Sequence, residues 1–145
     1  MKILNNICTV LLVLLAIMPG VAGSQSPVEE QLVTVEIKKL ALGATATCEL
    51  VKNGSPMNKA AVFSSTLKKV YCYTNFTSVP EKVFTFHNWY LRDRLKASIK
   101  LVLRPTRWST YSAMELRSSD RGPWRVEVTD EDGNVLETLR FSIID

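Results

Sequence analysis

Residue types that commonly carry catalysis are scarce in this chain. His87 is the only histidine, so a histidine metal cluster is excluded and a Ser-His or Cys-His arrangement has one candidate base. No Gly-x-Ser-x-Gly sequence, which presents the nucleophile in many hydrolases, accompanies it. Because His87 lies in an apolar stretch close to Trp89, we expect a hydrogen-bonded structural histidine. The sequence therefore predicts no catalytic residue and a protein that is not an enzyme.

An acidic run at residues 130–134 superficially resembles a calcium-binding loop. A calcium loop needs alternating oxygen ligands and a terminal bidentate Glu at fixed spacing, and the spacing here does not match. The run joins two strongly patterned apolar segments and contains Gly133, which suits a positive φ. It therefore predicts a solvated hairpin turn, and we expect no metal site and no cofactor.

Basic residues cluster with aromatic residues further along the chain. Arg104 and Arg107, next to Trp108, have the chemistry to bind an anionic or sugar ligand through charge and stacking. The same pattern fits a solvated sheet face on which lysines and arginines protect a strand edge, and we favour that reading. Arg104, Arg107 and Trp108 are therefore the candidate ligand surface. The cluster falls within sixteen residues opposed only by Asp93, and it comprises Arg92, Arg94, Lys96, Lys100, Arg104 and Arg107.

The N-terminal residues have the pattern of a secretory signal peptide. A positive residue, Lys2, precedes an apolar run from Ile7 to Met18, and small residues follow up to Gly23. The run is shorter than the about 20 apolar residues of a membrane span, and Cys8 is not placed as a lipid-modified cysteine would be. We predict cleavage near Gly23, a periplasmic or secreted location, no stable membrane insertion after cleavage, and no nucleic-acid partner.

Cleavage would leave Cys48 and Cys72 as the only possible cysteine pair, in a compartment where disulfides persist. Closing the loop of about 25 residues would stabilise the fold by about 3.5 kcal/mol on the chain-entropy model. The alternatives are two buried free thiols, or a metal pair that lacks two further ligands. We predict a disulfide between Cys48 and Cys72.

The remaining chain is long enough for one domain. Removing residues 1–23 leaves 122 residues and takes the formal net charge from +4 to +3, because Lys2 is the only charge removed. That balance is too mild to dictate a partner. A domain of this size buries about two-thirds of its unfolded surface. We predict a polar arm at 24–31 and a single domain at 32–145.

Short alternating apolar segments indicate strands throughout this domain. The segment 83–91 is apolar on both faces, which predicts a central strand covered on both sides. No helical periodicity appears after residue 30, so we predict an all-β fold, an Ig-like antiparallel β-sandwich. It is Ig-like only in architecture, because both cysteines precede Trp89. Strands are expected at 33–48, 70–76, 83–91, 97–103 and 107–116, and in a last hairpin of 124–129 and 139–143.

Four stretches in order identify a resemblance: VYCYT at 70–74, HNWY at 87–90, RWSTYS at 107–112, and GPWRVEV at 122–128 followed by the acidic turn. Together they resemble a bacterial family, domain of unknown function 2914, from about Leu40 to Ile144. The chain departs from the family pattern in two turns, at 54–56 and at 92–94. The resemblance implies a bacterial, periplasmic protein and brings no known activity.

Two functions fit these bounds. The first is an exported non-enzymatic binding or structural module of the bacterial cell envelope, which contacts a protein partner through sheet edges or loops. The alternative is a small-ligand or glycan-binding domain that uses Arg104, Arg107 and Trp108. An exposed Trp108 in a groove would favour the alternative, and a buried Trp108 would weaken it. A hydrolase would require a nucleophile within hydrogen-bond reach of His87.

Overall fold

The computed structural model describes residues 38–145. The predicted signal peptide (1–23), the polar arm (24–31) and the first part of the first predicted strand (33–37) lie outside these residues. No helix in the described part of the chain has the length and apolar character to cross a membrane. In chain order the strands are β1 (Ala41–Lys52), β2 (Ser55–Lys59), β3 (Val62–Ser64), β4 (Lys69–Ser78), β5 (Val83–Leu91), β6 (Arg94–Leu103), β7 (Trp108–Glu115), β8 (Gly122–Asp130) and β9 (Val135–Ile144).

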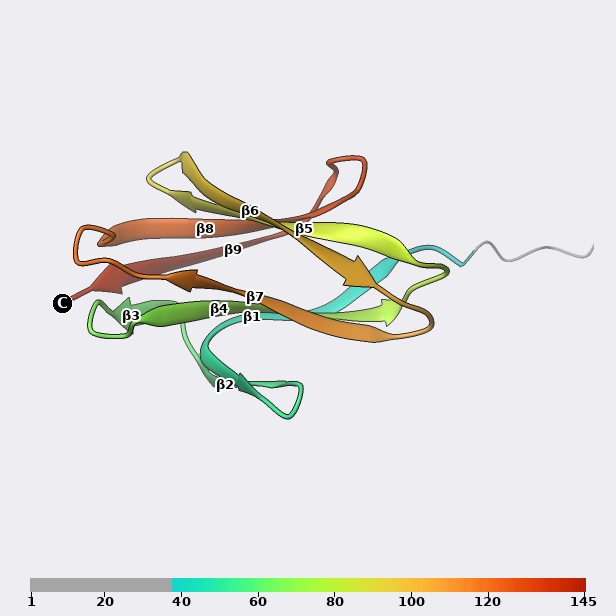
Figure 1. The fold of residues 1–145 in the computed structure, drawn as a ribbon, viewed down its shortest axis with the longest axis horizontal. Coiled ribbons are helices and arrows are strands. Elements are labelled where there is room, and N and C mark those ends of the chain that lie inside the picture. The colour runs from blue at the N-terminus through green and yellow to red at the C-terminus, as the bar shows by residue number, and fades with distance from the viewer. Residues whose placement is uncertain (1–37) are drawn as a thin grey trace, which may run out of the picture. The chain divides into compact units, whose positions relative to one another are not determined.

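The strands form two sheets, which lie as two layers in Figure 1. One sheet has four strands in the order β2-β1-β4-β7, and the other has five in the order β3-β9-β8-β5-β6. The predicted all-β sandwich is therefore confirmed. One detail differs, because β3 pairs with β9 in parallel, whereas every other pairing is antiparallel. The short β3 lies between the expected strands 33–48 and 70–76, in a segment for which the sequence predicted no strand.

The core lies between the sheets and follows the predicted alternation. On β8 the side chains of Trp124, Val126 and Val128 are buried, and on β9 those of Phe141 and Ile143 are buried. These residues form one apolar cluster with side chains of β4, β5 and β6. Burial of such side chains supplies most of the free energy that holds a sandwich together.

Strand β5 corrects one prediction. It is central in its sheet, between β8 and β6, but only the face that carries Trp89 is fully buried. The aromatic side chains on its other face are half-buried and are covered by cationic side chains. The Lys100 Nζ atom lies 3.6 Å from the Phe84 ring centroid, and the Arg125 guanidinium lies 4.0 Å from that of Tyr90. Long cationic side chains thus replace a second layer, as an antiparallel sheet with one solvated face permits.

The acidic run at 130–134 forms the predicted hairpin turn between β8 and β9. The Asp130 carboxylate accepts hydrogen bonds from the backbone N–H groups of Asp132 and Asn134 and from the Asn134 side chain. These bonds, the Asn134 side chain first, lower the pKa of Asp130. Gly133 has a φ of 85°, the left-handed conformation that favours glycine.

The two cysteines do not form the predicted disulfide. Both are free thiols, and both are buried. Thr47 lies opposite Cys72 in the β1–β4 pairing, and Cys48 lies opposite Tyr71. Residues directly opposite one another share a face of the sheet, and successive residues alternate between faces. Cys48 and Cys72 therefore point to opposite faces, a geometry that cannot be bridged without moving the backbone. The alternative of two buried thiols describes the structure.

The register predicts two free thiols in the folded protein. Alkylation in denaturant without reductant should modify both Cys48 and Cys72, measured by peptide mass mapping. Without denaturant both should react slowly, since burial raises the pKa of each thiol. The same sample reduced before alkylation is the control. If the two cysteines are modified only after reduction, the register of β1 against β4 is wrong.

Candidate functional site

The residues predicted as a ligand surface lie in the β6–β7 connection and at the start of β7, but they do not form an open stacking platform. Arg104 and Arg107 are exposed in the connection between β6 and β7. Trp108, the first residue of β7, is half-buried, lies opposite Phe76 and packs against the apolar core. This geometry weakens the case for a sugar stacked on the Trp108 ring, because core packing holds that side chain.

The basic cluster of the sequence separates in the fold. Arg94, Lys96 and Lys100 lie on β6, which is an edge strand of the five-stranded sheet. The register between β5 and β6 is irregular at Trp89 and Tyr90, and Lys96 is the extra residue there. Charged side chains and a bulge are common means of blocking unwanted pairing at a sheet edge. This placement agrees with the favoured reading of the cluster.

His87 joins a buried polar network between the two sheets. Its Nδ1 atom lies 2.8 Å from the Ser112 Oγ atom, and its Nε2 atom lies 3.4 Å from the Thr74 Oγ1 atom. Trp89 Nε1 donates a hydrogen bond of 3.0 Å to the same Ser112 Oγ atom. Thr74 Oγ1 also lies 3.5 Å from the Thr110 carbonyl oxygen. His87 and Trp89 come from β5, whereas Ser112 and Thr74 come from β7 and β4.

One protonation state pairs the donors and acceptors of this network. Because indole N–H only donates, Ser112 accepts from Trp89 and its hydroxyl proton is free to point to His87 Nδ1. The neutral imidazole then carries its proton on Nε2 and donates to Thr74, whose hydroxyl donates to Thr110. No buried side-chain nitrogen or oxygen in the described residues lacks a partner. A neutral His87 thus satisfies the network.

The Ser112–His87 pair has the atoms of a nucleophile and a base but lies inside the core. His87 is fully buried and Ser112 is 5% exposed. Burial lowers the pKa of His87 to about 4, so it is neutral at physiological pH. With Trp89 bonded to the same hydroxyl oxygen, the arrangement accounts for these residues as a structural link between the sheets.

This link predicts that the protein loses stability in mild acid. The unfolded chain takes up a proton near pH 6.5 and the folded chain only near pH 4, so stability falls as the pH drops through this window. We expect a loss of about 2 kcal/mol in unfolding free energy between pH 7.5 and pH 5 from this residue. Urea unfolding at both pH values measures it, and His87→Gln should remove this component. Because His87 is the only histidine, NMR titration gives its pKa directly; a value near 6.5 in the folded protein would contradict the network.

The network also predicts the cost of removing one hydroxyl group. Ser112→Ala leaves Trp89 Nε1 and His87 Nδ1 without their partner inside the core, which should cost about 2–4 kcal/mol of unfolding free energy. Ser109 on the same strand provides a matched control, because its Oγ accepts hydrogen bonds from Tyr73 and Asn75 at an exposed position. Ser109→Ala should cost less than about 1 kcal/mol. Equal losses of unfolding free energy in the two variants, measured by urea unfolding, would show that the buried network stabilises the fold no more than the exposed hydrogen bonds of Ser109 do.

A cluster of tyrosines covers the outer face of the four-stranded sheet. Tyr73 lies directly opposite Tyr111 in the β4–β7 pairing, and the ring centroids of Tyr71 and Tyr111 lie 5.9 Å apart. Tyr111 is 50% exposed. On β1 and β2 of the same sheet, Leu50 and Met57 lie opposite each other and are also exposed. Tyrosine-rich surfaces of this kind are typical of protein interfaces.

Next to this face lies the open edge of β7, and it differs from the other sheet edges. No described strand pairs with its far side. Its eight residues contain no proline, carry one charge at the last residue, Glu115, and pair with β4 without a register shift. By contrast, β2 is short and contains Pro56, β3 has three residues, and β6 carries basic residues and a bulge. Among the described edges, β7 alone combines length, regular pairing and a single charge at its end.

Sequence reasoning missed this edge as a site. The segment WSTYSAME shows low charge, which was a usable signal, but a strand's position at an edge depends on pairing with distant segments. The residues singled out instead, Arg104, Arg107 and Trp108, lie immediately before it and at its first position.

Comparison with known families agrees with the resemblance found in the sequence. Residues 81–143 match the model of a family described as a protein of unknown function, DUF2914. The match covers β5 to β8 and nearly all of β9, and it confirms the resemblance found in the sequence over these residues. No curated protein matches the chain.

Proposed function

We propose that this chain, whose residues 81–143 match the model of the DUF2914 family, is an exported, non-enzymatic binding module of the bacterial cell envelope. In this proposal it contacts a protein partner by accepting an extended segment along β7. Export rests on the signal-peptide pattern of the sequence. The single observation that supports the binding mode is the long, regular edge of β7, which carries one charged residue at its end.

Strand addition uses the chemistry that such an edge offers. The outward backbone N–H and C=O groups of alternate residues on β7 supply the main-chain hydrogen bonds, and side-chain pockets supply the specificity. Tyr111 and the adjacent Tyr71 give the incoming segment an aromatic surface on the outer face. Tyrosine is among the residues that contribute most to binding energy at interfaces.

The alternative function, binding of a glycan or small ligand by Arg104, Arg107 and Trp108, has less support. It needs an open ring face at Trp108, and that side chain packs against the core. The exposed arginines alone would give charge without the stacking that orients a sugar.

Site-specific photo-cross-linking in cells tests the proposed contact. A photoreactive phenylalanine replaces Tyr111 on β7 or, as the matched control, Leu95 on the protected edge β6, which is similarly exposed at 56% against 50%. We expect a discrete cross-linked protein with the probe at 111 and none with the probe at 95. A product of twice the chain's mass would identify the partner as a second copy. Absence of a product at 111, or equal products at both positions, would overturn the proposal.

Lysine substitution gives a second test that needs no probe. Tyr111→Lys adds to β7 the kind of charge that natural edges use against pairing, so it should weaken binding of the cross-linked partner about tenfold or more. Leu95→Lys on β6 and the double variant Arg104→Ala with Arg107→Ala should leave binding unchanged. Loss of binding only in the arginine variant would favour the alternative function. Unchanged thermal unfolding in all three variants controls for folding.

A further inference from the structure

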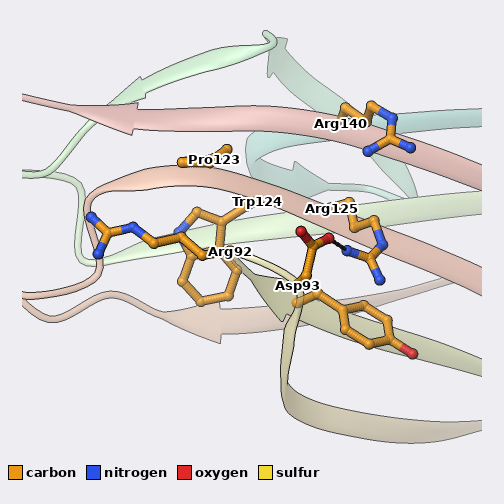
Figure 2. A pocket seen from close by; sticks show the side chains of 7 residues that line it. Arg92, Asp93, Pro123, Trp124, Arg125 and Arg140 are labelled. Atoms are coloured by element: carbon orange, nitrogen blue, oxygen red, sulfur yellow. Dashed lines mark hydrogen bonds and ion pairs between the residues drawn. The ribbon is translucent and has the colours of Figure 1, made fainter.

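A small pocket lies on the outer face of the five-stranded sheet, beside the turn between β5 and β6 (Figure 2). Its volume is about 140 Å³, enough for a single ionic group but not for a large ligand. Three arginines and one aspartate line it, so the lining carries a net positive charge. The lining residues are Tyr90, Arg92, Asp93, Pro123, Trp124, Arg125 and Arg140.

Arg125 is held in a fixed orientation on one side of this pocket. Its Nε atom donates a hydrogen bond of 2.8 Å to Glu127, and its Nη1 atom is paired with Asp93. The guanidinium group lies 4.0 Å from the ring centroid of Tyr90, and the side chain is only 18% exposed. A guanidinium group has five N–H donors, and in the described residues those of Nη2 have no partner. The sheet therefore presents an oriented, partly unused donor group.

Arg140 lies directly opposite Arg125 in the β8–β9 pairing. Figure 2 shows the two guanidinium groups on the same side of the sheet. Like charges at directly opposite positions are destabilising, and Arg140 has no ion pair within residues 38–145. An anion between the two groups would turn this repulsion into attraction.

The turn beside the pocket has a second local departure from the favoured pattern. Arg92 and Asp93 have φ values of 47° and 64°, whereas such two-residue turns favour Asn and Gly because both residues need a positive φ. The two side chains are used in the structure. Asp93 pairs with Arg125, and Arg92 Nη2 donates to the Arg121 carbonyl at 2.9 Å. The turn thus holds one wall of the pocket in place.

The Arg92 side chain packs closely against the backbone of Gly122. Gly122 has a φ of 116°, and a Cβ atom added there would lie 3.0 Å from Arg92 Nε. Two residues with positive φ and a repulsive arginine pair therefore line one small pocket, and a required glycine packs against one of them, Arg92. Departures of this kind cluster where a protein binds a ligand.

We propose that this pocket binds an oxyanion, a carboxylate or a phosphate group, between the guanidinium groups of Arg125 and Arg140. Planar guanidinium groups pair with both kinds of oxyanion through parallel N–H donors. The Asp93 carboxylate keeps Arg125 in position and leaves the Arg140 side as the place where an anion binds. This site lies on the sheet opposite to the one that contains β7, so it does not depend on the proposed strand addition.

NMR titration of the purified, exported chain tests the site. Sodium acetate, inorganic phosphate and sodium chloride are added separately at constant ionic strength, while the N–H resonances of Arg92, Arg125 and Arg140 are followed. We expect saturable shifts with acetate or with phosphate, which also tells the two oxyanions apart, and only small linear shifts with chloride. Linear shifts with all three salts would show general screening and overturn the proposal.

Two arginine variants separate a built site from general surface charge. Arg140→Gln should weaken binding of the saturating anion about tenfold or more, since it removes a charged donor. Arg117→Gln, at an exposed arginine in the β7–β8 connection, should leave the affinity unchanged. Because Arg140 is exposed and faces a like charge, its variant should unfold at the same or a slightly higher temperature. Equal affinity in wild type and Arg140→Gln would overturn the proposal.

Discussion

The hydrogen bonds that meet at the Ser112 hydroxyl are the constraint on which the rest of the structure depends. Trp89 and His87 place two polar ring atoms in the apolar core, and both find their partner in one serine of the opposite sheet. A buried polar group without a partner costs far more than the net value of its hydrogen bond. If β7 shifted by one residue against β4, Ser112 would move to the outer face and both ring atoms would lose their partner. The network thus selects one register for β7 and one alignment of the two sheets.

This constraint makes β7 a rigid edge strand. The strand is paired with β4 along its whole length, and its inner face is held by Ser112. A rigid edge loses little conformational entropy when another chain binds it, which favours binding. If the other edges were equally rigid and open, they would allow unwanted pairing with other chains. They are instead short, charged or bulged, so in the proposed strand addition β7 is the edge left for pairing.

The sequence predicted those features that depend on neighbouring residues. The bounds of β5 agree with the expected segment 83–91, and the β8–β9 hairpin has the expected inner face, because alternation is a local signal. β6 begins earlier than expected, since the bulge at Lys96 interrupts its alternation. The disulfide prediction used only the number of cysteines, whereas the relative facing of Cys48 and Cys72 depends on the register of two strands. Edge positions and the parallel pairing of β3 likewise depend on segments that are distant in sequence.

The charge pattern of the sequence is limited in the same way as a guide to the folded structure. The basic run that stands out between residues 92 and 107 separates on folding into a turn, an edge strand and a loop. Arginines come together in space at the pocket beside the β5–β6 turn. There Arg125 and Arg140 become neighbours only because β8 and β9 pair in one register. Asp93, the one acid within the basic run, then serves to orient Arg125 rather than to neutralise its sequence neighbours. A charge pattern along a strand is therefore a guide to edge protection, while a charged site arises from strand pairing, which places side chains from separate segments on one face.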